Sequence, residues 1–324
     1  GGLLNLARQR ADSKGRLLLT FATAVYDPLC INFLAHIREL QMTNYLVVTF
    51  TAAYHKSLVT RGEQPYLHSL PSLTSDGSDV FASKDFFTIN AARYTVLTKL
   101  LRGGVHIFTV DLDVVLLRNP FPYVWGETHD LLLQSDARDA TTLVETSPFL
   151  LRDRLHLPSA SNVTYVNGGV FFARGTHAVA RLFEDAWALT SQDLGTLNEQ
   201  DCLNRMLLSS SLQWAPLPPS LFPNGFVYFR RPLSPSADAS TDPTLGRSAS
   251  SAAVGPILIH CNWINSIAAK RYLLREARIW AEDGNTRAHG LLLSQGGTPS
   301  NILPAPRYLA YTNSQAEKRT LHAQ

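Results

Sequence analysis

The sequence predicts an α/β domain with a mixed, mainly parallel β-sheet that is covered by helices on both faces. Segments rich in apolar and β-branched residues alternate with segments of helical periodicity, as in a parallel sheet whose strands are joined by helices. One of these segments, residues 105–110, reads as a buried strand and leads directly into Asp111-Leu112-Asp113. Ligands of such sheets bind beyond the carboxyl ends of the strands, so this acidic pair lies where a ligand site is expected.

The composition and charge of the chain are those of an ordinary globular protein. Of its 324 residues, 45% are hydrophobic and 17% are charged. The net charge of +3, without a run of Lys or Arg, argues against nucleic acid as a partner. No stretch approaches the roughly 20 apolar residues that span a bilayer. Cys30, Cys202 and Cys261 form no CxxC pair, so a zinc or redox site has no support.

The first half of the chain alternates regularly between strands and helices. The expected elements are a strand at 16–23, a helix at 27–41, a strand at 45–50, a loop at 60–80, a helix at 86–102 and the strand that begins at 105. Asp27 is the expected N-cap of the first helix, with Pro28 at its first helical position. Gly103 and Gly104 are expected to end the second helix.

The second half of the chain is less regular. Strands are expected at 131–136, 165–174 and 255–264, and helices at 176–190, 198–209 and 266–281. Gly168 and Gly169 lie inside one of these strands, where glycine marks the close approach of another backbone or of a ligand. The Ser-, Ala- and Pro-rich stretch 232–255 is expected to be a flexible insertion, and the periodic signal fades after 282.

Asp111 and Asp113 form a candidate metal site on the residues alone. Because side chains alternate along a strand, the two carboxylates lie on the same face. Two like charges so close together need a counter-charge, and carboxylate oxygens suit a divalent cation such as Mg²⁺ or Mn²⁺. The alternative is an acidic loop at the strand end that simply faces solvent.

Several sequence blocks occur in an order that resembles one known family. These blocks are FASKDFFTINAARYTVLTKLLRGG, VHIFTVDLDVVLLRNPF, LLLQSD, YVNGGVFFAR, NEQDCLN and HCNWI. This succession, within roughly residues 17–281, resembles glycosyltransferase family 77, the plant and algal arabinosyl- and xylosyltransferases with the GT-A fold. The resemblance implies a single GT-A domain over 1–324, with a catalytic core at 17–281, the insertion at 232–255 and a C-terminal extension at 282–324.

The family pattern also implies a metal site and a donor site. The resemblance implies Mn²⁺, or Mg²⁺, held by Asp111, Asp113 and His260, and a Lys270 that reaches the donor diphosphate. Ser266 stands where the family usually has a glycine between this histidine and this lysine. The residues implied in binding a UDP-sugar donor are Thr23, Tyr26, Lys84, Arg93, Asp111, Leu112, Asp113, Asn167, Gly168, Gly169, His260, Asn262 and Lys270. Ordinary structural roles, such as solvated helix faces for Arg93 and Lys270, are the alternative.

Residues 198–201 depart from the family, which usually has Asp-Gln at this place. Glu199 takes the place of the aspartate and Gln200 that of the glutamine, while Asp201 is an additional acid. The implied catalytic residues are Glu199, Gln200, Asp201 and Asp136, and either Glu199 or Asp201 could face the sugar. Asn198 can also act as a helix N-cap with acids in the first turn.

The function implied by the resemblance is that of a metal-dependent, retaining glycosyltransferase. It would move a pentose, with L-arabinofuranose as the first expectation, from a UDP-sugar to a cell-wall glycoprotein (a hydroxyproline-linked arabinoside) or a polysaccharide. UDP-xylose with a pectic acceptor is the alternative within the family. Retention would follow either front-face attack, which we expect, or a covalent glycosyl carboxylate. The family also implies a Golgi-lumen, single-pass type II membrane protein, with its N-terminal anchor outside this sequence.

Two alternatives belong to other classes of protein. In a haloacid-dehalogenase-type phosphatase, Asp111 would be the nucleophile and Asp113 the general acid, but that motif normally opens its domain and here lies far from the start. A non-catalytic, UDP-binding scaffold is the second alternative. The intact set of Asp111, Asp113 and His260 argues against it.

Overall fold

A computed structural model describes residues 2–71, 73, 84–124, 128–138, 155, 163–192, 198–230 and 255–281. Within these residues the main sheet has seven strands in the order β3-β2-β1-β4-β7-β6-β8. They are β1 (Arg16–Ala22), β2 (Tyr45–Thr49), β3 (Tyr66–Leu67), β4 (His106–Val110), β6 (Leu131–Ser135), β7 (Val166–Ala173) and β8 (Trp214–Leu217). Every pairing is parallel except those of β7, which runs antiparallel to β4 and β6. The predicted mixed, mainly parallel sheet is confirmed.

A second, two-stranded sheet joins distant parts of the chain. Strands β5 (Val114–Leu116) and β9 (Leu258–His260) pair antiparallel, with Val114 opposite His260. The short β5 follows β4 after the turn Asp111-Leu112-Asp113, in which the Val114 N–H donates to the Asp111 carbonyl at 3.2 Å. This pairing therefore carries His260 to the acidic end of β4.

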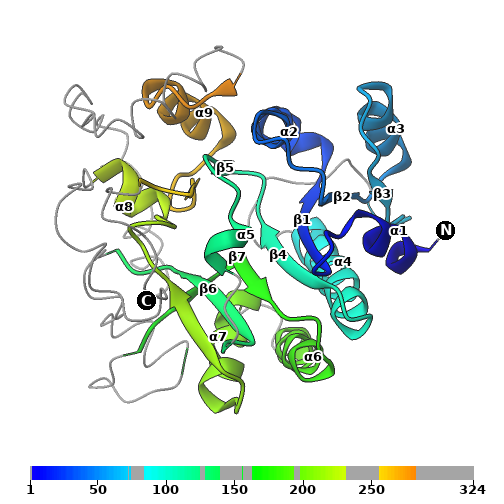
Figure 1. The fold of residues 1–324 in the computed structure, drawn as a ribbon, viewed down its shortest axis with the longest axis vertical. Coiled ribbons are helices and arrows are strands. Elements are labelled where there is room, and N and C mark those ends of the chain that lie inside the picture. Colours follow the sequence, from blue (N-terminus) through cyan, green and yellow to red (C-terminus); the bar gives the residue numbers. More distant parts are fainter. Residues whose placement is uncertain are drawn as a thin grey trace.

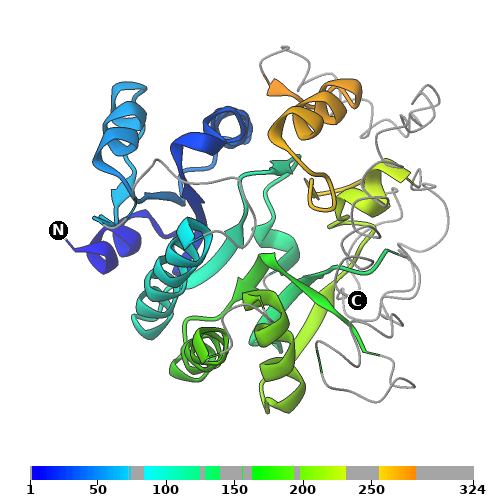
Figure 2. The same ribbon diagram turned by 180° about the vertical axis from the view of Figure 1, so that it is seen from behind.

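Helices cover both faces of the main sheet, as Figures 1 and 2 show from opposite sides. They are α1 (Leu3–Arg10), α2 (Asp27–Glu39), α3 (Ala52–Thr60), α4 (Lys84–Arg102), α5 (Phe121–Val124), α6 (His177–Gln192), α7 (Glu199–Ser209), α8 (Gly225–Arg230) and α9 (Ile267–Glu276), with a 3₁₀ turn η1 at Ala24–Tyr26. Among these helices none has the length and apolar character needed to cross a membrane.

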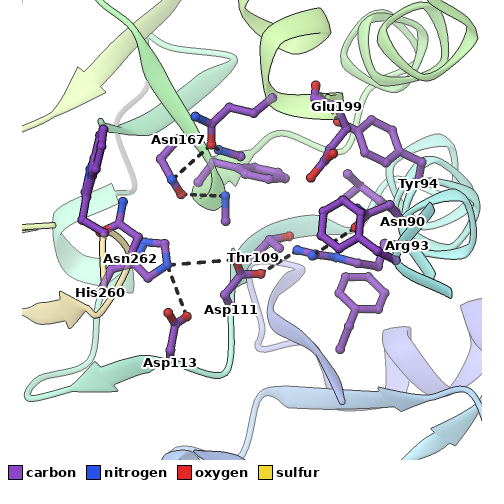
Figure 3. Close-up of a pocket in the computed structure, with 18 of the residues that line it drawn as sticks. Asn90, Arg93, Tyr94, Thr109, Asp111, Asp113, Asn167, Glu199, His260 and Asn262 are labelled. Carbon is purple, nitrogen blue, oxygen red and sulfur yellow. Dashed lines mark hydrogen bonds and ion pairs between the residues drawn. The ribbon is translucent and has the colours of Figure 1, made fainter. Parts of the chain in front are cut away.

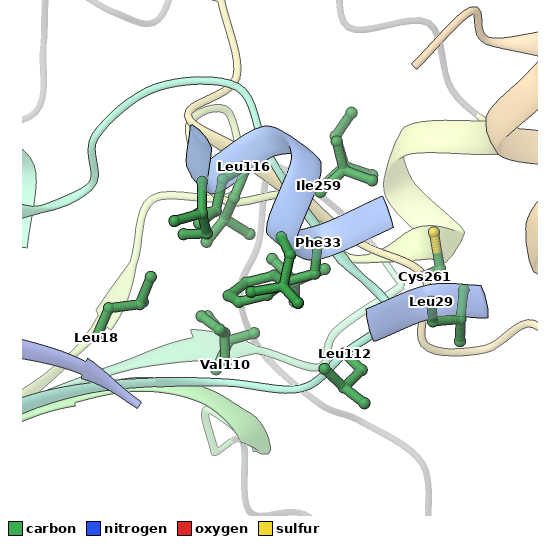
Figure 4. Close-up of a cluster of buried hydrophobic side chains, with 14 of the residues drawn as sticks. Leu18, Leu29, Phe33, Val110, Leu112, Leu116, Ile259 and Cys261 are labelled. Carbon is green, nitrogen blue, oxygen red and sulfur yellow. The ribbon is translucent and has the colours of Figure 1, made fainter. Parts of the chain in front are cut away.

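Alternating side chains of the central strands supply two hydrophobic cores. Leu18 and Val110 pack with α2, β5 and β9 on one face (Figure 4), whereas Leu17 and Leu19 pack with α1 and α4 on the other. Each such buried leucine contributes about 1.5–3 kcal/mol of hydrophobic stabilisation. Strand β4 ends at Val110, so the expected strand does not reach Asp111 and Asp113, and Leu112 between them belongs to the first core.

Several expected elements differ in the structure. Tyr26, not Asp27, is the N-cap of α2, because the 3₁₀ turn η1 continues into the helix and gives Asp27 helical dihedral angles. The strand expected at 255–264 is regular only over β9, and it is followed by turns around the left-handed Trp263 and Ser266. Helices α1 and α3 and strand β8 are short and were not expected.

The domain limits remain a prediction. The extension expected at 282–324 lies outside the described residues, and so does the insertion expected at 232–255 apart from Gly255.

Candidate active site

Asp111, Asp113 and His260 converge at the carboxyl end of β4 (Figure 3). One ligand atom from each lies within 4.8 Å of the others. His260 Nε2 is 3.3 Å from Asp113 Oδ1 and 4.0 Å from Asp111 Oδ2. Two carboxylates and one imidazole suit Mn²⁺ or another divalent cation, so these residues fit the predicted metal.

The second oxygen of each carboxylate forms an ion pair with a basic side chain. Arg93, from the middle of α4, is 2.6 Å from Asp111 Oδ1, and Lys270, from the first turn of α9, is 2.6 Å from Asp113 Oδ2. Burial acts to raise the pKa of Asp113, but Lys270 and His260 outweigh it and hold that pKa well below its usual value. Asp113 therefore stays ionised, with Oδ1 directed at His260 and available to a metal.

Gln134, which the sequence reasoning did not single out, fixes the orientation of His260. It is fully buried in β6, its amide nitrogen donates to the Phe222 carbonyl at 3.0 Å, and its Oε1 lies 2.7 Å from His260 Nδ1. Because Oε1 can only accept, Nδ1 must carry a proton, and in the neutral ring the lone pair is left on Nε2. The only sequence signal for this role is that Gln134 is a polar residue directly after the apolar run 131–133 of a predicted strand.

Replacing Gln134 with methionine is expected to weaken Mn²⁺ binding about 10–100-fold, the usual cost of losing a partner that orients a ligand. Isothermal titration calorimetry with Mn²⁺ measures this directly. Asn32→Leu is the matched control, because Asn32 is a buried amide that bonds the Ala281 backbone, away from the site. An unchanged Mn²⁺ affinity in Gln134→Met would show that His260 needs no such partner.

Asp136 is the centre of a second cluster, beside the metal residues. Asn262 donates to its Oδ1 at 2.7 Å and the Trp263 indole at 3.1 Å, while Gln200 donates to Oδ2 at 3.1 Å. Burial raises the pKa of Asp136, and these donors act in the opposite direction. Asp136 thus organises the pocket wall rather than presenting a free carboxylate.

Both the oxygen and the nitrogen of the Gln200 side-chain amide form hydrogen bonds. Its Oε1 accepts from the Asn167 side chain at 3.1 Å and from the Gly168 N–H at 3.0 Å. Since its nitrogen donates to Asp136, the predicted residues Asn167, Gly168, Gln200 and Asp136 form one connected network. The structure therefore brings together these residues of β7, α7 and the end of β6.

Glu199 and Asp201 differ sharply in position. Glu199 lines the cavity beside the metal residues, and its buried Oε2 has no hydrogen-bond partner among the described residues. Burial raises its pKa. Asp201 instead caps α7 with Asn198 and accepts from the Tyr165 hydroxyl at 2.5 Å. Residues two apart in a helix point about 200° apart, so Asp201 turns into the core while Glu199 lines the cavity. The catalytic role of Asp201 stays a prediction.

Two cavities meet at the metal residues. The larger, of about 380 Å³, contains Asn167, Gly168, Glu199 and Asn262, and the smaller, of about 190 Å³, contains the predicted Thr23, Tyr26 and Leu112. Both are lined by Arg93, Asp111, Asp113 and Lys270. Lys84 begins α4, but its side chain lies outside the described residues.

Ser266 shows why a glycine is usual at its place. Its φ is 70°, a left-handed conformation that glycine adopts without strain. The Ser266 hydroxyl accepts from the Ala269 N–H at 3.2 Å and so caps α9, the helix that carries Lys270. Serine at this place thus adopts a positive φ and also caps the helix.

The sequence was compared with known protein families to identify the family of this chain. Residues 40–274 match the nucleotide-diphospho-sugar transferases. The chain belongs to this family. The expected resemblance to glycosyltransferase family 77 is confirmed, and the phosphatase alternative is wrong.

Known relatives of this transferase come from Arabidopsis thaliana. UDP-D-xylose:L-fucose alpha-1,3-D-xylosyltransferase 3 is 26% identical over 222 residues, which cover 66% of this chain and 52% of that protein. Arabinosyltransferase XEG113 is 22% identical over 229 residues, which cover 66% of this chain and 34% of that protein. The chain therefore spans about half the length of the xylosyltransferase it matches.

A solved structure of an active-site mutant of LgtC resembles this transferase with a TM-score of 0.50 at 13% identity. The match covers 79% of this chain and 93% of LgtC. Such a likeness concerns the fold alone, and it confirms the predicted GT-A fold.

The transferase is expected to bind Mn²⁺ more tightly as pH rises. Burial alone would lower the pKa of His260, but the Asp113 and Asp111 carboxylates raise it above its usual value of 6.5. A proton on Nε2 competes with the metal, so affinity should increase as pH rises through this raised pKa. Metal-free stability should change in the opposite sense, because the His260 contribution is complete below pH 6.5 and is lost above the raised pKa.

Calorimetry at several pH values around the raised pKa of His260 tests how Mn²⁺ affinity changes with pH. Thermal denaturation of the metal-free protein over the same pH values tests how stability changes. In the His260→Asn variant, the part of the pH dependence that His260 contributes to Mn²⁺ affinity and to stability should be lost. A wild-type affinity that is flat with pH would contradict the expectation.

Proposed function

We propose that this chain transfers a pentose from a UDP-sugar to a glycan or glycoprotein acceptor, with a divalent metal at Asp111, Asp113 and His260. The observation that carries the proposal is that two cavities share Asp111 and Asp113 in their lining, while His260 lines the larger one. A nucleoside diphosphate sugar has the matching layout, with a base and a sugar on either side of two phosphates.

The smaller cavity suits the nucleoside. The ring of Tyr26 lines it and can pack against a uracil base. Thr23 Oγ1 is buried there without a hydrogen-bond partner among the described residues, so it is available to a polar base or ribose atom.

The metal residues suit the diphosphate. A bound Mn²⁺ would act as a Lewis acid that neutralises charge on the departing UDP. Lys270 adds a fixed positive charge beside Asp113, in the position to stabilise the same leaving group. Arg93 orients Asp111 from the opposite side of the strand end.

The larger cavity suits a small polyhydroxylated ring. Asn90 Nδ2, Thr109 Oγ1 and Glu199 Oε2 line it, and none of these buried atoms has a hydrogen-bond partner within the described part of the chain. Unpaired buried donors and acceptors are costly, so a ligand that carries hydroxyl groups would satisfy them. These atoms support a sugar, and the names of the relatives support a pentose.

Retention of configuration by front-face attack is part of the proposal. A covalent route needs a carboxylate at the reacting carbon, and of the two acids in the first turn of α7 only Glu199 lines the cavity. Mass spectrometry of the protein after incubation with a UDP-pentose and no acceptor tests this route. A glycosyl adduct on Glu199 would replace the front-face route with the covalent one.

The donor is tested with a panel of UDP-L-arabinofuranose, UDP-xylose, UDP-glucose and UDP-galactose in Mn²⁺. We expect UDP release from a pentose donor to exceed that from the hexose donors. L-arabinofuranose is the first candidate from the sequence, and D-xylose is favoured by the xylosyltransferase relatives. Comparable release from the hexoses would overturn the pentose assignment.

A non-catalytic scaffold would give a different outcome. It would show a UDP- and Mn²⁺-dependent rise in melting temperature without any UDP release from the panel. For the full-length protein we propose the Golgi lumen, which microscopy of a fluorescent fusion can test.

A further inference from the structure

Trp263 is an exposed aromatic residue at the rim of the larger cavity. It retains 41% of its accessible surface, although it lines the same cavity as the metal residues. Its backbone is also unusual, with φ at 63° in the left-handed region that large side chains rarely adopt. A strained, exposed tryptophan beside a reaction site indicates a functional constraint rather than a packing need.

The surroundings hold Trp263 firmly in this conformation. Its indole N–H donates to Asp136 Oδ1 at 3.1 Å, and the preceding Asn262 donates to the same oxygen at 2.7 Å. Asn262 Oδ1 in turn accepts from the Gly225 N–H at 2.9 Å. A Cβ at Gly225 would lie 2.3 Å from the Asn262 carbonyl oxygen, so glycine lets this loop sit against α8. The ring is thus preorganised.

Two side chains extend the aromatic surface. The Phe226 ring meets Trp263 edge-on, with 6.3 Å between centroids. The guanidinium carbon of Arg138 lies 5.7 Å from the Trp263 ring centroid and 6.0 Å from that of Phe226. We call Trp263, Phe226 and Arg138 the rim platform. It combines an electron-rich ring face with hydrogen-bond donors, which matches the C–H face and the hydroxyl groups of a sugar ring.

The position of the rim platform separates it from the donor. Asn90, Thr109 and Glu199 present buried atoms to the larger cavity, and Asn90 also lines the smaller one. Figure 3 shows Asn90 and Glu199 on the wall opposite Asn262, the neighbour of Trp263. Trp263 is exposed to solvent at this cavity, so an acceptor attached to a polymer can reach it from outside.

We propose that the rim platform binds the terminal sugar ring of the acceptor by stacking on Trp263. This assignment rests on the proposed glycosyltransferase function and adds an acceptor subsite to it. Asp136 then has two tasks, because it binds the Trp263 indole and also holds Gln200 in the donor wall.

The test compares Trp263→Ala, Trp263→Phe and Tyr272→Ala. Tyr272 is the matched control, since it is 48% exposed but lies on α9 and does not line either cavity. Binding of an L-fucose-terminated oligosaccharide and of an arabinosylated hydroxyproline peptide is measured by saturation-transfer NMR with UDP and Mn²⁺. Acceptor KM and donor KM are measured separately in transfer assays.

Trp263→Ala is expected to weaken acceptor binding and to raise acceptor KM about tenfold or more, with a much smaller change in donor KM. Trp263→Phe keeps a ring face and should recover most of this loss, and Tyr272→Ala should resemble wild type. Equal effects of Trp263→Ala and Tyr272→Ala on acceptor binding would overturn the proposal. So would a rise in donor KM as large as that in acceptor KM. Glycan binding without UDP release would instead reject the proposed function and leave the subsite standing.

Discussion

Replacing Asp113 with alanine is expected to lower the Mn²⁺-dependent transfer rate about 1,000-fold or more. The charge stabilisation that a metal supplies is worth several kcal/mol, and each 1.36 kcal/mol is a factor of ten in rate. The same change should lower the free energy of unfolding of the metal-free protein by about 3 kcal/mol, because it leaves the buried Lys270 ammonium without its carboxylate partner.

Kinetics and urea denaturation of Asp113→Ala measure the two effects separately. Asp185→Ala is the control, since Asp185 forms an exposed pair with Arg181 and should change unfolding by less than about 0.5 kcal/mol. If Asp113→Ala retained Mn²⁺-dependent UDP release, Asp113 would not be a metal ligand.

Gly169→Ala is expected to reduce Mn²⁺ affinity about 100-fold, although Gly169 carries no ligand atom. A Cβ there would lie 2.2 Å from Asp111 Oδ2 and 2.8 Å from its carboxyl carbon. Such contacts are impossible, so Asp111 must leave its place between Arg93 and His260. The neighbouring strands β4 and β7 leave little room for any other adjustment.

Gly168→Ala provides a matched control on the same strand. Its Cβ would meet Gln200 at an ordinary 3.7 Å and would point away from Asp111. Calorimetry with Mn²⁺ alone should therefore give near wild-type affinity for Gly168→Ala. Equal losses in the two variants would mean that general strain in β7, not contact with Asp111, controls metal binding.

Strand periodicity is what made the acidic pair predictable. Asp111 and Asp113 do converge and Leu112 packs in the core, but the structure places them in the turn after β4 and not in the strand itself. His260 was harder to place, because about 150 residues separate it from Asp111 and no local pattern links them. Only the order of family blocks indicated it, and the pairing of β5 with β9 explains the contact.

Other features depend on contacts that sequence alone does not specify. Whether Glu199 or Asp201 faces the cavity depends on where α7 begins, and a shift of two residues would bring Asp201 to the place of Glu199. The roles of Gln134 and Trp263 arise from partners on distant strands and loops. The strained backbone at Trp263 is likewise a product of tertiary structure, since nothing in its own sequence favours a positive φ.

The short β5–β9 pair has a consequence for local unfolding. Three residue pairs and a 3.0 Å bond from the Cys261 N–H to the Asp113 carbonyl join residues 258–261 to the strand end. The segment also bonds Leu221 and Pro223 and packs in the first core, but β9 lies outside the main sheet, so it can open locally while that sheet stays folded. Such opening removes His260 from the site. Bound Mn²⁺ should therefore hold residues 258–261 against the end of β4. Hydrogen exchange of the His260 and Cys261 amides should slow markedly when Mn²⁺ and UDP are added, while exchange within β1 and β4 stays unchanged.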